Sequence, residues 1–169
     1  FKQKYFLSDM TSFGVPEKEL VELFETSMNS KRKRIAKNFQ EDFYPGPQLG
    51  LNVIQPDSYM RPHFRYSDEH IIWYSGRLCS LIFDESEDVR RGQILNRESP
   101  YIFLPAQTYH TVISLEENSA IWFVTQGPFD KNKFSEFLPN TPSEKENYWD
   151  YFEFLKKMAM TTNALKNSS

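Results

Sequence analysis

The sequence predicts a mainly β protein built as a single antiparallel sandwich or barrel, with one helix before the strands and one after them. Short stretches of strand-favouring residues alternate with turn residues between about residues 49 and 126, and no long helical pattern interrupts them. Aromatic residues make up 16% of the 169 residues, and aromatic side chains favour strands. A chain of this length suits one domain.

Eight stretches are expected as strands, separated by turn signals such as Gln55-Pro56-Asp57, Gly76 and Gly92. They cover residues 49–54, 59–65, 70–75, 77–83, 93–95, 101–104, 110–114 and 120–126. Within one domain overall, we therefore expect a lead-in over residues 1–48, a barrel over 49–130 and a C-terminal extension over 131–169.

Helices are predicted at both ends of the strand region. Val15–Glu19 is typical of a helix start, and the basic run Lys31–Arg34 suits the end of that helix, where cations interact favourably with the dipole. A contact with a phosphate or another acidic ligand is the alternative role of the run. Thr141–Glu144 has the form of a capping box, so a helix is expected to begin there and to pack on the outer wall. The polar tail over 161–169 is expected to fray.

The composition argues against several classes of protein. A net charge of −3 and a pI near 5.7 do not suit a nucleic-acid-binding protein. No apolar run approaches the ~18 residues of a membrane span and no signal peptide is visible, so we expect a cytoplasmic protein. The single cysteine, Cys79, excludes an intramolecular disulfide and a multi-cysteine zinc site, and its place in an apolar strand predicts a buried thiol.

Two of the three histidines lie in informative surroundings. His63 precedes Glu69 by six residues, and His110 follows Pro105 by five. Because alternate residues of a strand share a face, His63 and Arg65 should point the same way. Two imidazoles and a carboxylate that meet inside a barrel suit a first-row divalent metal such as Fe, Mn, Zn, Ni or Co.

These segments resemble the two motifs of the cupin superfamily, with matching positions at His63, Glu69, Gly76, Pro105 and His110. From about residue 30 to residue 144 the chain is similar to the WbuC-type cupin-fold metalloproteins, which are found near bacterial O-antigen and surface-polysaccharide genes. The similarity lies in segments 30–34, 58–63, 76–78, 83–84, 109–112, 127–130 and 142–144. It implies a cupin-type jelly roll, metal ligation by His63, Glu69 and His110, and a homodimer formed through edge strands.

The motifs also depart from the superfamily pattern. Arg65 replaces the second histidine of the first motif, and Gln107 replaces the glycine of the second. The fixed positive charge of Arg65 opposes a dication and suits an ion pair with Glu69. Two states follow: a metal held by His63, Glu69 and His110 with Arg65 swung aside, or an Arg65–Glu69 ion pair without a metal.

The first functional hypothesis is an enzyme that acts on a sugar or sugar nucleotide. Its catalytic residues would be His63, Glu69 and His110. An isomerase or epimerase that transfers a proton next to a carbonyl, or a metal-dependent oxygenase, would fit these groups.

The second hypothesis is a non-catalytic, metal-free module that binds an anionic small ligand through Arg65. Tyr74 and Tyr59 are candidates for stacking on a sugar ring. The third is a structural protein that has kept the barrel and lost the site. His70 should face away from the site, because it follows Glu69 directly on the same strand.

Overall fold

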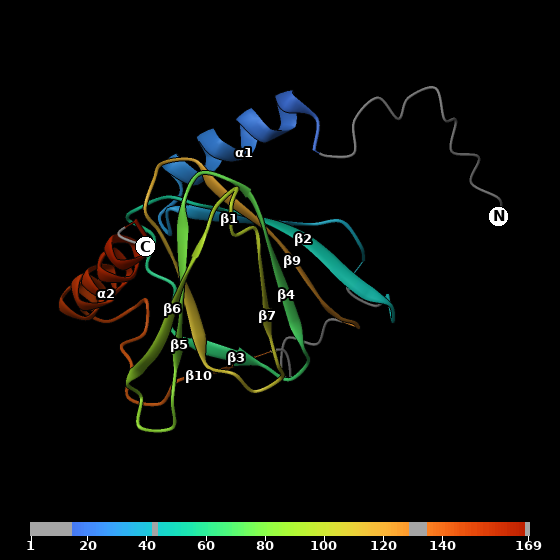
Figure 1. Cartoon of the computed structure of the whole chain (residues 1–169). Helices are drawn as coiled ribbons and strands as arrows, with labels where there is room; N and C mark the ends of the chain where they lie inside the picture. Colours follow the sequence, from blue (N-terminus) through green and yellow to red (C-terminus); the bar gives the residue numbers. More distant parts are fainter. Residues whose placement is uncertain (1–14, 42–43, 129–134, 168–169) are drawn as a thin grey trace.

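Two antiparallel sheets face each other, with one helix on the outside of each sheet (Figure 1). The computed structural model describes residues 15–41, 44–128 and 135–167. Successive strands pass back and forth between the two sheets, which is the jelly-roll arrangement. The predicted fold class, a mainly β barrel with a helix near either end, is confirmed.

Each sheet has five strands. The first has the order β1 (Arg34–Asn38), β2 (Pro47–Ile54), β9 (Ser119–Gln126), β4 (Glu69–Ser75) and β7 (Tyr101–Leu104). The second has the order β10 (Ser135–Phe137), β3 (His63–Arg65), β8 (His110–Ser114), β5 (Leu78–Phe83) and β6 (Val89–Leu95). Strands β1 and β10 lie outside the range predicted for the barrel, at one edge of each sheet.

Apolar side chains from both sheets fill the space between them. This inner cluster consists of Ile54, Ile71, Leu78, Leu95, Ile102, Leu104, Val112 and Ile121. Helix α2 (Trp149–Asn167) covers the outer face of the second sheet, where Phe152, Leu155 and Ala159 are fully buried. Helix α1 (Glu17–Asn29) covers part of the outer face of the first sheet near Leu51 and Val53.

The basic run Lys31–Arg34 does not end helix α1, which corrects the prediction. The helix ends at Asn29, its last turn holds no basic residue, and Arg34 is the first residue of β1. The chain leaves the helix at Ser30 in an extended conformation and turns at Lys33, whose φ is 54°. The charged residues of β1 hide its strand character in the sequence. Arg34 in this strand and Arg32 just before it both line the pocket described below.

The C-terminal helix begins at Trp149, later than the capping-box pattern predicts. Ser143 donates its backbone N–H to Glu146 Oε2 at 2.6 Å, and the Glu146 N–H returns to the Ser143 carbonyl at 3.1 Å. These bonds close a turn rather than a helix end. Helix α2 then continues to Asn167. The prediction that the chain frays from residue 161 is therefore wrong for residues 161–167.

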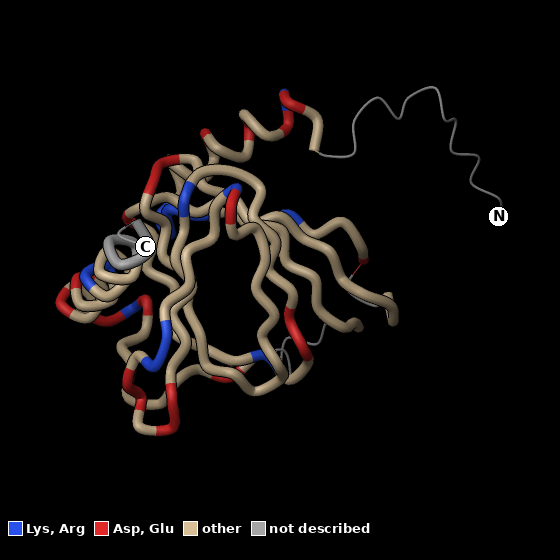
Figure 2. The backbone as a smooth tube through the Cα atoms, viewed as in Figure 1, with Lys and Arg blue, Asp and Glu red and all other residues tan. Residues whose placement is uncertain are grey.

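Charged residues gather on the helices and connecting loops, while most of the strand backbone around the interior carries uncharged residues (Figure 2). Cys79 is fully buried in β5, as predicted. Neither α1 nor α2 combines the length and the hydropathy that a bilayer crossing requires.

Candidate functional site

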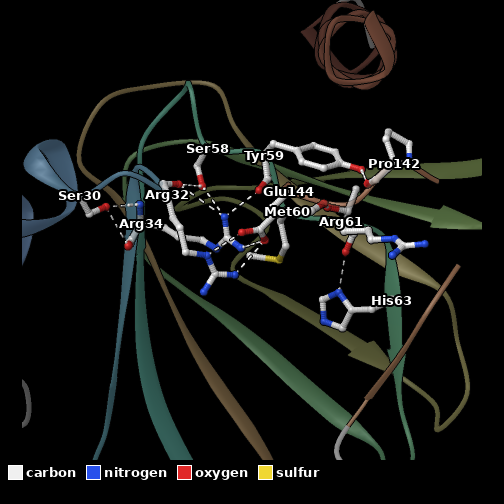
Figure 3. Close-up of polar contacts among 11 residues, drawn as sticks. Ser30, Arg32, Arg34, Ser58, Tyr59, Met60, Arg61, His63, Pro142 and Glu144 are labelled. Carbon is white, nitrogen blue, oxygen red and sulfur yellow. Dashed lines mark hydrogen bonds and ion pairs between the residues drawn. The ribbon is translucent and has the colours of Figure 1, made fainter. Parts of the chain in front are cut away.

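His63 and His110 lie directly opposite each other on the paired strands β3 and β8, and their ring centroids are 4.8 Å apart. His63 Nδ1 is 3.0 Å from the Arg61 carbonyl, a contact visible in Figure 3, and His110 Nδ1 is 2.9 Å from the Thr108 carbonyl. A carbonyl oxygen only accepts, so each Nδ1 carries the donated proton. Nε2 of each ring is therefore the atom left for contacts in the site.

Glu69 reaches the same place from the opposite sheet, as the first residue of β4. Its side chain is buried, with Oε2 lying 3.2 Å from His110 Nε2 and 3.7 Å from Arg65 Nε. The structure thus brings together His63, Arg65, Glu69 and His110. His70 packs instead against Tyr101 on the outer face of the first sheet, as the strand alternation predicts.

Burial and nearby positive charge set the protonation of the site. Burial lowers the pKa of His63 to about 3, with further lowering from His110 and Arg65, so this imidazole is neutral at pH 7. For Glu69, burial raises the pKa, but the hydrogen bond from His110 and the charges of His110 and Arg65 outweigh it and bring the pKa to about 2. His110 Nε2 and Glu69 Oε2 lie 3.2 Å apart, and the carboxylate oxygen is the accepting atom of this contact.

As arranged, these side chains do not fit a divalent metal. Among the residues that the structure describes, no three His, Cys, Asp or Glu side chains are grouped as a metal-ligand set. The carboxylate that a metal would need is already paired with Arg65. A dication about 4 Å from a guanidinium would be repelled by roughly 8 kcal/mol at an effective dielectric near 20. Metal ligation by His63, Glu69 and His110 therefore stays a prediction, and it requires Arg65 to move.

A pocket of about 490 Å³ opens beside this cluster. Its wall contains His63 and Arg65 from β3, Phe137 from β10, and residues from β1 and β2. The complete lining is Arg32, Arg34, Ile35, Ala36, Asn52, Met60, Arg61, His63, Arg65, Ser135, Phe137 and Glu144. Four arginines and one carboxylate, Glu144, belong to this lining, and among the described residues Glu69 also lies at ion-pair distance from Arg65.

Arg32, Arg34 and Glu144 form a second charged group in the pocket wall (Figure 3). Arg32 donates from Nε and from Nη2 to the two carboxylate oxygens of Glu144 at 2.8 Å each, and Arg34 Nη2 also binds Glu144 Oε1. No pattern in the sequence connects these residues. The basic run and the Pro-Ser-Glu segment both stand out in the sequence, yet more than 100 residues separate them.

Two other predicted ligand-binding residues lie outside the pocket, which corrects the sequence analysis. Tyr59 is 2% exposed, stacks on Tyr148 with centroids 4.5 Å apart, and donates its hydroxyl to the Pro142 carbonyl. Tyr74 packs edge-on against Trp122 in the cluster between α1 and the first sheet. Both tyrosines serve packing between elements, because their positions turn them towards a helix rather than the lumen.

Comparison with solved structures identifies the architecture. The capsular polysaccharide assembling protein CapF from Staphylococcus aureus is 17% identical and superposes with a TM-score of 0.54, over 64% of this chain and 32% of CapF. Oxalate decarboxylase from Lactobacillus farciminis is 14% identical with a TM-score of 0.52, over 65% of this chain and 32% of the enzyme. The chain has a cupin-type fold.

A third structure, protein SO0799 from Shewanella oneidensis, is 10% identical with a TM-score of 0.57, over 72% of this chain and 84% of that protein. This cupin-type chain spans about a third of the length of CapF and of the decarboxylase. The model of a domain of unknown function, DUF6016, matches residues 15–95. No curated protein matches the chain by sequence. At these identities the likeness concerns the fold.

Proposed function

We propose that this cupin-type barrel binds an acidic small molecule in the pocket beside His63, with Arg65 as the anchor. The observation that carries the proposal is the composition of the described pocket wall, which holds four arginines and one carboxylate, Glu144, with Glu69 behind Arg65. A volume of about 490 Å³ lies within the ~300–1,000 Å³ range of small-ligand pockets. An anion entering this space gains charge-assisted hydrogen bonds from guanidinium groups.

Arg65 suits the anchoring role because it is held in place and still borders the pocket. Its side chain is 17% exposed, and its Nε lies at ion-pair distance, 3.7 Å, from Glu69. His63 beside it is neutral at pH 7 and offers Nε2 as an acceptor for a ligand hydroxyl.

We further propose that the ligand is derived from a sugar. CapF, one of the solved structures with the same fold, is a capsular polysaccharide assembling protein. The sequence resemblance to proteins found near bacterial surface-polysaccharide genes points to the same chemistry. Sugar acids and sugar phosphates combine an anionic group with several hydroxyls, and the pocket offers both arginines and polar side chains such as Asn52 and Ser135.

Isothermal titration calorimetry tests this function with matched ligands. Glucuronate and glucose 6-phosphate should bind at least tenfold more tightly than glucose, and Arg65→Gln should lower the affinity for both acids by about 10- to 100-fold, the value of a charge-assisted hydrogen bond. Arg91→Gln, which removes an exposed arginine outside the pocket, serves as the control and should leave both affinities unchanged. Equal affinity for glucose and its acidic derivatives would overturn the proposal.

A second candidate function, a metal-dependent enzyme acting on a sugar, draws on one specific observation. Both imidazoles donate from Nδ1 to a backbone carbonyl, the arrangement that orients metal-ligating histidines in many proteins. With Arg65 displaced, His63, Glu69 and His110 would hold the ion, which would polarise a substrate carbonyl. Metal content of the purified protein should then rise in an Arg65→His variant. An unchanged metal-to-protein ratio in that variant would rule this candidate out.

A further inference from the structure

Arg32 and Arg34 converge on one carboxylate with the geometry of an oxyanion site. Arg32 donates to the Glu144 carboxylate through Nε and Nη2 at 2.8 Å each, in a side-on arrangement. Arg34 donates a third N–H to the same carboxylate. Parallel N–H groups directed at two oxygens are the arrangement by which arginine binds carboxylates and phosphates. These donors lie in the wall of the same pocket that contains Arg65.

Arg34 is fixed in this position by groups other than Glu144. Its side chain is only 8% exposed, and its Nη1 donates to the Tyr59 carbonyl at 2.7 Å and to Ser58 Oγ at 3.3 Å (Figure 3). The Ser58 hydroxyl is itself held by the Arg32 carbonyl at 3.0 Å. Arg34 would therefore keep its orientation if the Glu144 carboxylate withdrew, because the bonds from its Nη1 to the Tyr59 carbonyl and to Ser58 Oγ remain.

Glu144 is the more replaceable partner. It lies in the irregular segment between β10 and α2, and its side chain is 30% exposed. Its bond to Arg32 is at the surface, where the Arg32 side chain is 61% exposed and an ion pair contributes little. In the described part of the chain, two guanidinium groups share this single carboxylate, which balances one of their two positive charges. A phosphate carries up to two charges and three acceptor oxygens, and it would balance both arginines.

We propose that Arg32 and Arg34 form a second anion subsite of the pocket, which Glu144 occupies until a phosphate displaces its carboxylate. Resting on the function proposed above, this subsite defines the ligand class: a small molecule with two acidic groups, a phosphate at Arg32 and Arg34 and a second acid at Arg65. One ligand can engage both groups because all three arginines line one pocket of about 490 Å³.

Calorimetry with fructose 1,6-bisphosphate, fructose 6-phosphate and fructose tests the subsite. The bisphosphate should bind at least tenfold more tightly than the monophosphate. Arg32→Gln should abolish that preference by weakening the bisphosphate, whereas Glu144→Gln should increase the preference several-fold by removing the competing carboxylate. Arg32 is chosen over the buried Arg34 because its exposed side chain can change without disturbing the fold. Lys31→Gln removes a neighbouring charge outside the pocket lining and is the matched control.

The outcomes separate this inference from the function on which it rests. If both phosphates bind better than fructose and depend on Arg65 but have equal affinities, the second subsite is wrong and the anion-binding pocket stands. A bisphosphate preference that survives Arg32→Gln, or that is reduced equally by Lys31→Gln, also overturns the subsite. If neither phosphate binds better than fructose, the proposed function itself is wrong.

Discussion

Replacing Glu69 with glutamine measures how strongly the carboxylate stabilises Arg65 inside the barrel. Arg65 Nε and Glu69 Oε2 are 3.7 Å apart, and the two side chains are 17% and 6% exposed. Unit charges at this distance attract by roughly 4 kcal/mol at an effective dielectric near 20. Loss of one member of a buried pair leaves the other charge uncompensated, which typically costs ~3–5 kcal/mol. We therefore expect Glu69→Gln to lower the free energy of unfolding by about 4 kcal/mol.

A double-mutant cycle isolates the pair from its surroundings. Urea unfolding would be followed by tryptophan fluorescence for the natural chain, Glu69→Gln, Arg65→Gln and the double variant, all in EDTA so that no divalent ion contributes. The double variant should lose less stability than the sum of the single variants, with a coupling free energy of about 2–3 kcal/mol. The contact between His110 and Glu69 contributes equally to both rows of the cycle and cancels.

A coupling below about 0.5 kcal/mol would refute this reasoning, because residues that share a buried ion pair should couple by more than that. Glu69 would then not be held by Arg65. The carboxylate would be available to a metal, and the second candidate function would gain the support that the present geometry withholds from it.

Three further predictions concern stability. Gln107 has a φ of 64°, and this conformation costs a non-glycine residue about 1 kcal/mol. Gln107→Gly should therefore raise the free energy of unfolding by up to ~1 kcal/mol. A lower melting temperature in this variant would contradict the backbone strain. Burial raises the pKa of Glu144, but hydrogen bonds and charge from the neighbouring arginines outweigh it and hold the pKa below the ordinary value of a glutamate. The ionised carboxylate therefore stabilises the fold above pH ~4.5, and this stabilisation is lost as the pH falls through the folded-state pKa. Urea unfolding should show a smaller stability difference between the natural chain and Glu144→Gln at pH 3 than at pH 7. Phe152→Ala should cost ~3–5 kcal/mol in chemical denaturation because Phe152 is fully buried between α2 and the barrel, whereas Phe154→Ala, at a position that is 45% exposed, should cost less than ~1 kcal/mol.

Much of the barrel follows from local rules that the sequence displays. Strand β7 has the predicted bounds, Tyr101–Leu104, because Pro100 and Pro105 bracket it and the intervening residues alternate between exposed and buried. The shared direction of His63 and Arg65 follows from the two-residue period of a strand, and both residues line the pocket. Gln107 stands where the motif has a glycine. Its backbone is left-handed, a conformation that glycine adopts at little cost.

The second charged group could not be predicted in the same way. The local sequence does not predict that a strand begins at Arg34. The segment Arg34–Asn38 contains two charged residues, and it pairs with β2 alone because it lies at an edge of the sheet. The partner of Arg34 lies 110 residues further along the chain. The Pro-Ser-Glu segment has the local form of a helix start, and the tertiary contact with two arginines overrides that preference. Local patterns thus located the residues, and only the three-dimensional arrangement paired them.

The wall of the pocket combines residues from the beginning and from the end of the strand region. Arg32 and Arg34 come before β2, whereas Ser135, Phe137 and Glu144 come after β9. A chain emerging from the ribosome up to Gln126 has made both histidines and every residue of the inner apolar cluster, yet it lacks part of the pocket wall. The described pocket wall is therefore complete only when the residues from Ser135 to Glu144 have joined the barrel. Under the proposed function, affinity for an anion would report that this late part of the chain has joined the strands made before it.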